Sequence, residues 1–383
     1  MSEVITEGTF FNGVIADIAE INPRTDIALA EEERVSFLPM QNTSESGDII
    51  TLQERVFAQV SKGYTRFAEN DVLVAKITPC FENGKGGYAK GLLNGIGFGS
   101  TEFHIVRAIP GKADSRFLHH LTRSERFRKA GEGSMTGSAG QKRIPSNFIK
   151  DFPIFIPPLP EQKKIAEILS GMYNQILSVK SEIQQARKIS TAVTKNLLGS
   201  IQDGTLTLSE VAINHDSIRV PIKSEERALR NGPYRYFGAS GIIDSIDDFL
   251  FDGDYILIGE DGANIIDRNK PLAFKVSGKF WVNNHAHIIQ PRESCDINFL
   301  TYYLESLDYT GIASGSAQPK ITRSALDAIQ VPIPPLEVQK KIGAVIESTI
   351  DMATTAEKKE KKLIDLRKAL SSDLLSGRKR VSI

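Results

Sequence analysis

The sequence predicts an α+β protein made of two copies of one unit, each a strand-rich globular segment followed by a long helix. The main observation is an internal repeat, because IPPLPEQKKI at residues 156–165 returns as IPPLEVQKKI at 333–342, an offset of 177 residues. Three further matches keep the same order in both halves: ENDVLVA (69–75) with DGDYILI (252–258), RFLHHL (116–121) with NFLTYYL (298–304), and GSAGQKRI (137–144) with GSAQPKI (315–321). A repeat of this length indicates two similar domains.

Each globular segment is predicted to consist mostly of short strands. Runs such as Val72–Ala75, Phe103–Val106 and Tyr255–Ile258 are apolar, rich in β-branched residues and bounded by Gly, Asn or Pro. Short helices are expected near Phe117–Lys129 and Phe299–Leu307. A pair of prolines ends each segment, because the residue before a proline favours extended backbone.

Each proline pair is followed by a long helix with a heptad pattern. Apolar and small residues recur in alternating steps of four and three, with Ala186, Ser190, Thr349 and Ala356 among the small ones. The simplest way to bury both stripes is to pack the helices as an antiparallel coiled coil, with a globular unit at each end. The predicted seam consists of Ile165, Leu169, Met172, Ile176, Val179, Ile183, Val193 and Leu197 in the first helix and Ile342, Val345, Met352, Leu363, Leu366 and Leu370 in the second.

These assignments divide the chain into four parts in a pseudo-twofold repeat. The predicted parts are a first globular domain (1–158), a first long helix (159–207), a second globular domain (208–335) and a second long helix (336–383).

Length and composition indicate a cytoplasmic globular protein. The chain has 383 residues, of which 25% are charged and 40% hydrophobic, and at roughly 100–200 residues per domain this length fits two or three domains. No apolar run approaches the roughly 18 residues of a membrane span, and the acidic N-terminal stretch does not look like a signal peptide. Cys80 and Cys295 have no CxxC spacing, which argues against a disulfide framework or a zinc knuckle.

The sequence lacks the common catalytic motifs. It contains no GxxxxGKS/T phosphate loop, no HExxH, no GxSxG and no NPPY or DPPY. A nuclease role for Asp71 and Lys76 is disfavoured, because Lys76 aligns with Gly259 in the second copy. His285 and His287 form an HxH pair, but no third metal ligand is evident nearby, and hydrogen-bonding histidines on a strand are the preferred interpretation. We therefore predict a non-catalytic protein without a metal site.

Charge distribution points to nucleic acid, although the net charge is zero. Residues 1–61 hold 3 basic and 11 acidic residues, whereas residues 62–150 hold 15 basic and 7 acidic residues. Basic residues next to Tyr, Asn, Gln, Ser and Thr in Gly-rich loops suit phosphate contacts combined with base-edge recognition. The candidate DNA-binding residues of the first unit are Lys62, Tyr64, Arg66, Lys76, Thr78, Asn83, Lys85, Ser138, Gln141, Lys142 and Arg143.

The second unit is more acidic, with 12 basic and 17 acidic residues between 209 and 330. Such a domain can bind DNA only through a local basic face, and binding mainly to protein is the alternative. Its candidate DNA-binding residues are Tyr234, Arg235, Tyr236, Asn264, Asn283, Asn284, His285, Gln318 and Lys320.

The repeated junctions resemble a known family. IPPLPEQKKIAEIL after a strand-rich domain, repeated as IPPLEVQKKIGAVI, resembles the helical regions of the specificity (S) subunit of type I restriction-modification systems. KITPCFENGKGG (76–87) with GFGSTEFHIVRA (97–108) looks like one of that family's target-recognition domains. The segment 236–264 with GKFWVNNHAHII (278–289) looks like another. The resemblance covers essentially the whole chain.

This resemblance implies a DNA-recognition role. Each target-recognition domain would recognise one half of a bipartite sequence in double-stranded DNA, and the coiled coil would set the gap between the halves. The helices would also dock two methyltransferase subunits, which carry S-adenosylmethionine and flip the target adenine. Restriction subunits would supply a motor and nuclease using ATP and Mg²⁺. No cofactor is expected in this chain itself.

Two alternatives remain open from the sequence. The chain could be the specificity subunit of a type IIB-like restriction-modification enzyme, in which one partner polypeptide both methylates and cleaves. It could also be a coiled-coil scaffold whose globular ends bind proteins rather than DNA. A steep loss of affinity with salt would distinguish DNA binding from the scaffold role.

Overall fold

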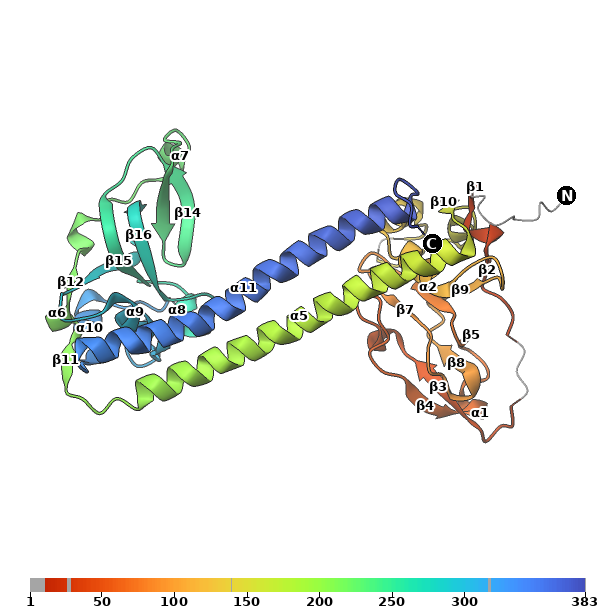
Figure 1. Ribbon diagram of the computed structural model, residues 1–383, viewed down its shortest axis with the longest axis horizontal. Coiled ribbons are helices and arrows are strands. Elements are labelled where there is room, and N and C mark those ends of the chain that lie inside the picture. The colour runs from red at the N-terminus through yellow and green to blue at the C-terminus, as the bar shows by residue number, and fades with distance from the viewer. Residues whose placement is uncertain (1–10, 26–28, 139, 316–317, 383) are drawn as a thin grey trace. The chain divides into compact units, whose positions relative to one another are not determined.

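The chain folds into two compact units (Figure 1). Unit 1 comprises residues 1–178 and 359–383, and unit 2 comprises residues 179–358. The structure is a computed structural model, and it describes residues 11–25, 29–138, 140–315 and 318–382.

Two long helices contribute to both units. Helix α5 (Leu159–Gly199) follows the first proline pair, and helix α11 (Leu336–Leu375) follows the second. They begin at residues 159 and 336, where the sequence places them, but α5 ends at Gly199 rather than at residue 207 and α11 ends at Leu375. Residues 205–207, which were predicted to be helical, form strand β11. Together with the strand-rich remainder, the two long helices confirm the predicted α+β class.

Unit 1 is built on a four-stranded sheet of order β2-β9-β6-β7, beside a second sheet of order β4-β3-β8-β5 and a β1-β10 pair. Helix α2 packs on the first of these sheets, because Phe117 and Leu121 share a buried core with Val72, Val106 and the start of α5. The strands are β1 (Phe11–Val14), β2 (Ala19–Ile21), β3 (Arg34–Leu38), β4 (Gln53–Val56), β5 (Thr65–Ala68), β6 (Val72–Ala75), β7 (Gly86–Tyr88), β8 (Ile96–Gly99), β9 (Phe103–Ala108) and β10 (Pro153–Ile156). The helices are α1 (Phe57–Val60), α2 (Ser115–Thr122), α3 (Glu125–Ser134) and α4 (Ser146–Lys150), with 3-10 turns η1 (Ile15–Asp17), η2 (Met40–Asn42) and η3 (Leu93–Gly95).

Unit 2 is built on one six-stranded sheet of order β12-β17-β15-β16-β13-β14, with a β11-β18 pair. Helix α9 packs on it, because Phe299 and Leu304 share a core with Ile256, Ile289 and Ile346 of α11. The strands are β11 (Thr205–Thr207), β12 (Ala212–Asn214), β13 (Tyr234–Gly238), β14 (Gly241–Ile246), β15 (Phe251–Gly259), β16 (Ala273–Val282), β17 (Ala286–Pro291) and β18 (Gln330–Pro332). The helices are α6 (Leu208–Val211), α7 (Ser224–Arg227), α8 (Asn264–Asp267), α9 (Ile297–Ser306) and α10 (Arg323–Asp327), with the 3-10 turn η4 (Asp216–Ile218).

The two units share one four-stranded arrangement, but in a register one residue different from the sequence match. The order β2-β9-β6-β7 in unit 1 corresponds to β12-β17-β15-β16 in unit 2. Val72 pairs with Val106, and Ile256 pairs with Ile289. Counting along these strands makes Glu260, rather than Gly259, the equivalent of Lys76. The alignment of Lys76 with Gly259 is therefore wrong, because apolar similarity alone cannot fix strand register.

The helix predicted near residues 117–129 is two helices. Helix α2 ends at Thr122 and α3 begins at Glu125. Ser124 separates them because its side chain accepts a hydrogen bond from Phe127 N and caps α3. Among the described residues, none of the helices is both long enough and apolar enough to cross a bilayer.

A buried glutamine fastens α5 to the globular part of unit 1. Gln162 is 1% exposed, and its Oε1 accepts a hydrogen bond from Asp114 N at 3.0 Å. Its Nε2 donates to Lys112 O and Pro157 O at 3.0 and 2.9 Å. Asp114 is the N-cap of α2, so one side chain joins the start of two helices and the strand end between them.

The same arrangement recurs in unit 2, and we call each buried glutamine with its three hydrogen bonds a glutamine clamp. Gln339 of α11 is fully buried; its Oε1 accepts from Asp296 N at 2.8 Å, and its Nε2 donates to Ser294 O at 3.2 Å and Pro334 O at 2.8 Å. Asp296 is the N-cap of α9. The glutamine of the repeated PEQKKI and EVQKKI sequences is therefore structural in both units.

Helices α5 and α11 pack against each other in an antiparallel arrangement, as predicted. In unit 2, Arg187 Nη2 lies 2.6 Å from Glu357 Oε1, and Thr349 Oγ1 donates to Ser190 Oγ at 3.1 Å. In unit 1, the guanidinium of Arg367 lies 5.0 Å from the ring centre of Tyr173. The α5 seam is confirmed by its burial; Met172, Val193 and Leu197 are half-buried, and those fully buried are Ile165, Leu169, Ile176, Val179 and Ile183.

The predicted α11 seam is partly wrong. Ile342 is buried and Leu363 and Leu370 are half-buried, but Val345, Met352 and Leu366 are 48%, 57% and 51% exposed. The covered row keeps Ile342, Leu363 and Leu370, and the residues that follow the three exposed ones take their places in it, namely Ile346, Ala353 and Arg367. Apolar side chains occupy two adjacent rows of this helix. In the covered row, Ile346 packs in the core of unit 2 and Leu374 packs in the core of unit 1.

This difference gives a matched pair of substitutions. Ile346→Ala should lower the free energy of unfolding by about 2–5 kcal/mol, because a large side chain leaves a buried site. Met352→Ala removes a similar volume from an exposed site and should change it by less than about 0.5 kcal/mol. Urea unfolding followed by circular dichroism measures both. Equal losses for the two variants would show that the seam includes Met352 after all.

Candidate nucleic-acid interface

Two loops of unit 1 bring several predicted residues together. The loop after β6 and the loop before α4 are joined by hydrogen bonds from Thr78 N to Lys142 O and from Ile144 N to Lys76 O, both 2.9 Å. The second loop is closed by a bridge between Thr136 and Arg143. Ser138, Gln141 and Lys142 are exposed. One part of the surface therefore carries Lys76, Thr78, Ser138, Gln141, Lys142 and Arg143.

Arg143 is held in place by a carboxylate that the sequence did not single out. Its Nε and Nη2 donate to Glu102 at 2.8–3.2 Å, and its Nη1 donates to Gln141 O at 3.1 Å. The hydrogen bond from Arg143 lowers the pKa of Glu102, and the same bond raises the pKa of Arg143. The Arg143 side chain remains 41% exposed.

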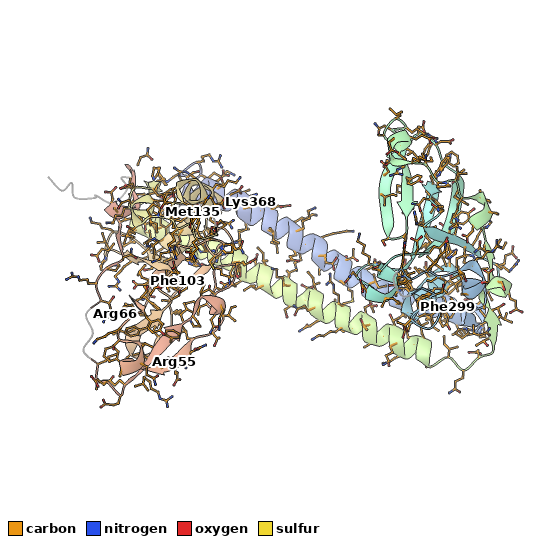
Figure 2. The ribbon with its side chains drawn as sticks, turned by 180° about the vertical axis from the view of Figure 1, so that it is seen from behind. Arg55, Arg66, Phe103, Met135, Phe299 and Lys368 are labelled. Carbon is orange, nitrogen blue, oxygen red and sulfur yellow. The ribbon has the colours of Figure 1, made fainter. Side chains whose placement is uncertain are left out.

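Lys62, Tyr64 and Arg66 lie on a neighbouring part of unit 1. Lys62 and Tyr64 precede strand β5, and Arg66 belongs to it; Figure 2 labels Arg66 together with Arg55 of β4 in the same sheet. Strand β5 pairs with β8, and the segment after β8 leads directly to Glu102. All three predicted side chains are exposed. The chain thus connects this group to the loops around Arg143.

The two remaining predicted residues of unit 1 are engaged in hydrogen bonds within the protein. Asn83 is exposed, but its Nδ2 donates to Glu45 Oε1 at 3.0 Å. Lys85 is half-buried, and its backbone bonds Cys80 O at 2.9 Å. Both residues lie in the loop after β6, so they stay candidates for DNA contact.

Unit 2 brings Lys320, Asn284 and His285 together in the same way. Lys320 pairs with Asp261 and Ser314 by backbone bridges, and its Nζ lies 3.0 Å from Glu260 Oε1. His285 Nδ1 lies 2.8 Å from Asp261 Oδ2. Gln318 is exposed in the loop that ends at Lys320, and Asn284 is exposed next to His285.

Other predicted residues of unit 2 do not face solvent. Tyr236 is completely buried and its hydroxyl accepts a hydrogen bond from Ile222 N at 3.0 Å, so the prediction that it contacts DNA is wrong. Asn283 is 8% exposed and its Oδ1 accepts from His285 N, which makes it a turn-forming residue rather than a DNA contact. Strand alternation explains Tyr236, because its neighbour Arg235 points outward and is exposed.

Tyr234, Arg235 and Asn264 are at least partly exposed. Tyr234 packs on Phe249 with ring centres 5.1 Å apart. Asn264 is half-buried and its side chain bonds the backbone of Lys270 in both directions, at 3.1 and 2.9 Å. Its amide is therefore engaged within its own loop.

A buried histidine is hydrogen-bonded to the residue that follows Arg143. His104 is 7% exposed, and its Nε2 donates to Ile144 O at 3.0 Å. Asn22 Oδ1 accepts from Ile105 N, so its Nδ2 faces His104 Nδ1 at 3.0 Å and donates to it. His104 is therefore neutral in this arrangement, and burial lowers its pKa.

Unit 2 has an equivalent buried histidine, but its second ring nitrogen faces an aspartate rather than an asparagine. His287 is 1% exposed; its Nε2 donates to Ile321 O at 2.9 Å and its Nδ1 faces Asp216 Oδ2 at 2.6 Å. Asp216 Oδ1 accepts from Ile288 N at 3.0 Å. A carboxylate and a carbonyl thus face the two ring nitrogens of His287. Asp216 thus occupies the role that Asn22 has in unit 1.

An ion-pair network surrounds this histidine. Arg219 Nη1 lies 2.6 Å from Glu260 Oε2, and Arg219 Nη2 lies 3.5 Å from Asp216 Oδ2. The ligand atoms of Asp216, Glu260 and His287 lie within 4.8 Å of one another, a spacing that would suit a metal ion. Arg219 and Lys320 already neutralise the carboxylates, so the arrangement is a closed salt-bridge network that fixes the loop of Lys320.

One protein family has a sequence model that matches both repeats of this chain. The family model described as the type I restriction modification DNA specificity domain matches residues 11–187 and 205–366. The chain belongs to this family. The two matched segments correspond to the two repeats, each with its long helix.

Named members of the specificity family are similar to this chain. The EcoAI specificity subunit of Escherichia coli is 40% identical over 194 residues, which are 50% of this chain and 32% of that protein. The EcoEI subunit of the same organism is 37% identical over 199 residues, again 32% of its length. The match therefore spans about a third of these relatives. The MjaVIII specificity subunit of Methanocaldococcus jannaschii is 25% identical over 424 residues, covering 99% of this chain and 93% of that one.

Solved structures of specificity subunits share the fold. A type I S subunit from M. genitalium superposes with a TM-score of 0.62 at 16% identity, covering 97% of this chain and 98% of the other. The HsdS subunit from Thermoanaerobacter tengcongensis gives 0.53 at 18% identity, covering 98% of both chains. These likenesses concern the fold.

Sequence reasoning missed the residues that position the specificity-domain loops. Glu102 and Glu260 contact the predicted cations Arg143 and Lys320 but lie far from them in sequence. Arg219 pairs with Glu260 and Asp216 and so supports the loop of Lys320 indirectly. A weak signal was present, because Glu102 and His285 each stand two residues before a buried histidine on equivalent strands. Only the pairing of β9 and β17 with their neighbours shows that these positions correspond.

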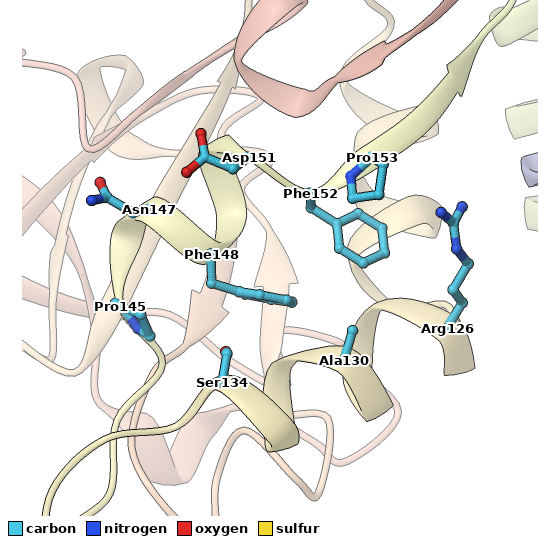
Figure 3. Close-up of a pocket in the computed structure, with 9 residues that line it drawn as sticks. All are labelled: Arg126, Ala130, Ser134, Pro145, Asn147, Phe148, Asp151, Phe152 and Pro153. Carbon is cyan, nitrogen blue, oxygen red and sulfur yellow. The ribbon is translucent and has the colours of Figure 1, made fainter.

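A hollow of about 490 Å³ in unit 1 borders the end of the loop before α4, where Pro145 is part of its wall. It lies between α3 and α4, and Figure 3 shows the rings of Phe148 and Phe152 over Ala130, with Arg126 and Asp151 at its edges. None of the predicted DNA-contacting residues lines it.

Acid should destabilise unit 2 through Asp216 and Glu260. Burial alone would raise the pKa of each carboxyl, but hydrogen bonds from His287 to Asp216 and from Arg219 and Lys320 to Glu260 lower both pKa values overall. Because the folded pKa lies below the unfolded one, the stabilisation is complete above about pH 5 and is lost as pH falls through the folded values. The transition of Trp281, the one tryptophan, should therefore move to lower urea concentration between about pH 5 and pH 3.

The control is Asp216→Asn, which copies the Asn22–His104 pair of unit 1. This variant should keep the fold near neutral pH and show a shallower loss on acidification, since one titrating carboxyl has been removed. Identical acid dependence in the two proteins would contradict this assignment.

Proposed function

We propose that this chain is the DNA-sequence-recognition subunit of a type I restriction-modification complex. In this proposal each unit recognises one half of a bipartite target in double-stranded DNA. The observation that carries it is the repeated loop: both units place an exposed basic residue, Arg143 or Lys320, on the same strand framework. Membership of the DNA specificity family supports the same role.

Helices α5 and α11 would set the gap between the two half-sites. They contain 41 and 40 residues and pack antiparallel. A helix of this length rises about 60 Å at 1.5 Å per residue, and it resists compression far better than a flexible linker. A fixed gap between two recognition domains follows from that stiffness.

The chemistry would reside in partner subunits. Two methyltransferase subunits would bring S-adenosylmethionine, and restriction subunits would bring ATP and Mg²⁺ for cleavage. The exposed apolar row of α11, which contains Val345, Met352 and Leu366, offers a surface for such a partner. This chain would itself be non-catalytic and would determine where the complex acts.

Methylome sequencing tests the proposal. Cells that express this chain with its methyltransferase should acquire one new bipartite methylated motif with a constant unspecified gap. The matched control expresses the methyltransferase alone and should show no such motif. Methylation that is unchanged by the presence of this chain would refute the proposal, as would binding of DNA by the purified complex that does not weaken between 50 and 200 mM salt.

A further inference from the structure

The same hydrogen-bonded framework ends at a basic residue in both units. In unit 1, His104 bonds Ile144 O at 3.0 Å and Ile144 N bonds Lys76 O at 2.9 Å. In unit 2, His287 bonds Ile321 O at 2.9 Å and Ile321 N bonds Glu260 O at 2.8 Å. The residue before each isoleucine is Arg143 in unit 1 and Lys320 in unit 2.

Most of the surroundings of these two cations differ. Lys76 of unit 1 corresponds to Glu260 of unit 2, because each donates its backbone N–H to the equivalent residue, Glu102 or His285, at 2.9 Å. The carboxylate that pairs with the cation therefore comes from the residue just before β9 in unit 1 (Glu102) and from the residue just after β15 in unit 2 (Glu260). The positive charge at the end of the loop is retained while the side chains that touch it are exchanged.

Each cation is paired with one carboxylate and keeps N–H groups that can donate further hydrogen bonds. Arg143 uses Nε, one Nη1 hydrogen and one Nη2 hydrogen on Glu102 and Gln141 O, and Lys320 uses one of three hydrogens on Glu260. Within the described part of the chain, two N–H groups remain on each. The side chains are 41% and 51% exposed, so these groups can reach a ligand in solvent.

We propose that Arg143 and Lys320 are equivalent DNA-phosphate contacts, one in each unit, and that Glu102 and Glu260 are their positioning residues. This inference rests on the proposed function. Two units with different loops would recognise different bases, but the phosphates are the same in every half-site. A cation kept at one position while its neighbours vary is suited to the part of DNA that does not vary.

A salt titration of DNA binding tests the phosphate contacts. The complex of this chain with its methyltransferase is bound to a duplex carrying the mapped target and to a scrambled duplex, and the dissociation constants are measured from 50 to 200 mM salt. Arg143→Gln and Lys320→Gln should each reduce the slope of log K against log salt by about 0.9 and weaken both duplexes by the same factor. Lys163→Gln and Lys340→Gln remove exposed lysines at equivalent positions of α5 and α11 and should leave the slope unchanged.

The outcomes separate this inference from the proposed function. A steep slope in the wild type that persists in both Arg143→Gln and Lys320→Gln overturns the phosphate contacts alone. Equal effects of Lys163→Gln and Lys340→Gln also overturn them, because general charge would then explain the result. A flat wild-type response overturns the proposed function itself.

The positioning role has its own readout. Glu102→Gln and Glu260→Gln remove a negative charge, so binding to the scrambled duplex should stay equal or become tighter, while the preference for the target falls several-fold because the cation is no longer held in one orientation. A merely structural role predicts a different pattern, in which both duplexes weaken together and the thermal midpoint drops. Arg143→Lys should restore the salt slope that Arg143→Gln loses, since it restores the charge.

Discussion

Adding four residues to each long helix should lengthen the gap in the methylated motif by one or two base pairs. Four residues add about 6 Å of helix, and successive base pairs lie about 3.4 Å apart. Duplicating Lys180–Ile183 directly after Ile183 and Ala353–Ala356 directly after Ala356 keeps an apolar or small residue in each seam. The contact between Arg187 and Glu357 places the two insertions close to each other along the helix pair.

Methylome sequencing reads the result directly. The two half-sites should stay the same, since neither globular unit is altered, and only the gap should change. Four residues added after the end of α11 lengthen the chain without lengthening the helix pair, and the gap should then be unchanged. A gap that ignores the duplications would show that something other than the helices determines the spacing.

Replacing Gln339 with leucine should strongly destabilise unit 2. The substitution leaves Asp296 N, Ser294 O and Pro334 O without their partner in a buried site. Each unsatisfied backbone group costs about 1–3 kcal/mol. We expect a total loss of about 3–5 kcal/mol, which is a large part of the stability of a domain.

Trp281 makes this measurement specific to one unit. It is the one tryptophan of the chain and is 6% exposed inside unit 2, so its fluorescence follows the unfolding of that unit. Gln162→Leu makes the equivalent change in unit 1 and should leave the Trp281 transition in place while lowering the stability measured by circular dichroism. A Gln339→Leu protein with an unchanged Trp281 transition would mean that the clamp contributes nothing.

The sequence was a good guide to features that repeat or that have a strong period. The starts of α5 and α11 follow from the proline pairs, and the α5 seam follows from a single unambiguous apolar row. The α11 seam could not be placed in the same way. Val345 and Ile346 are adjacent and both apolar, and the packing of the unit 2 core determines that Ile346 is the covered one.

In the candidate interface, some residues could be predicted from the sequence and others could not. Exposed basic residues in Gly-rich loops could be proposed from composition, because loops that close on themselves leave long side chains in solvent. Their partners could not, since Glu102 reaches Arg143 across 41 residues of chain. Tyr236 shows the limit of composition, because an aromatic residue beside an exposed arginine on a strand points to the opposite face.

The glutamine clamps have a consequence for how the protein can evolve. The hydrogen bonds of the Gln162 and Gln339 side chains go to main-chain atoms, which every amino acid supplies apart from the N–H that proline lacks. The side chains at these positions can therefore change without loss of the hydrogen bonds that attach the globular part to the helix. One globular part can thus diverge in sequence while the two long helices and the other globular part stay unchanged.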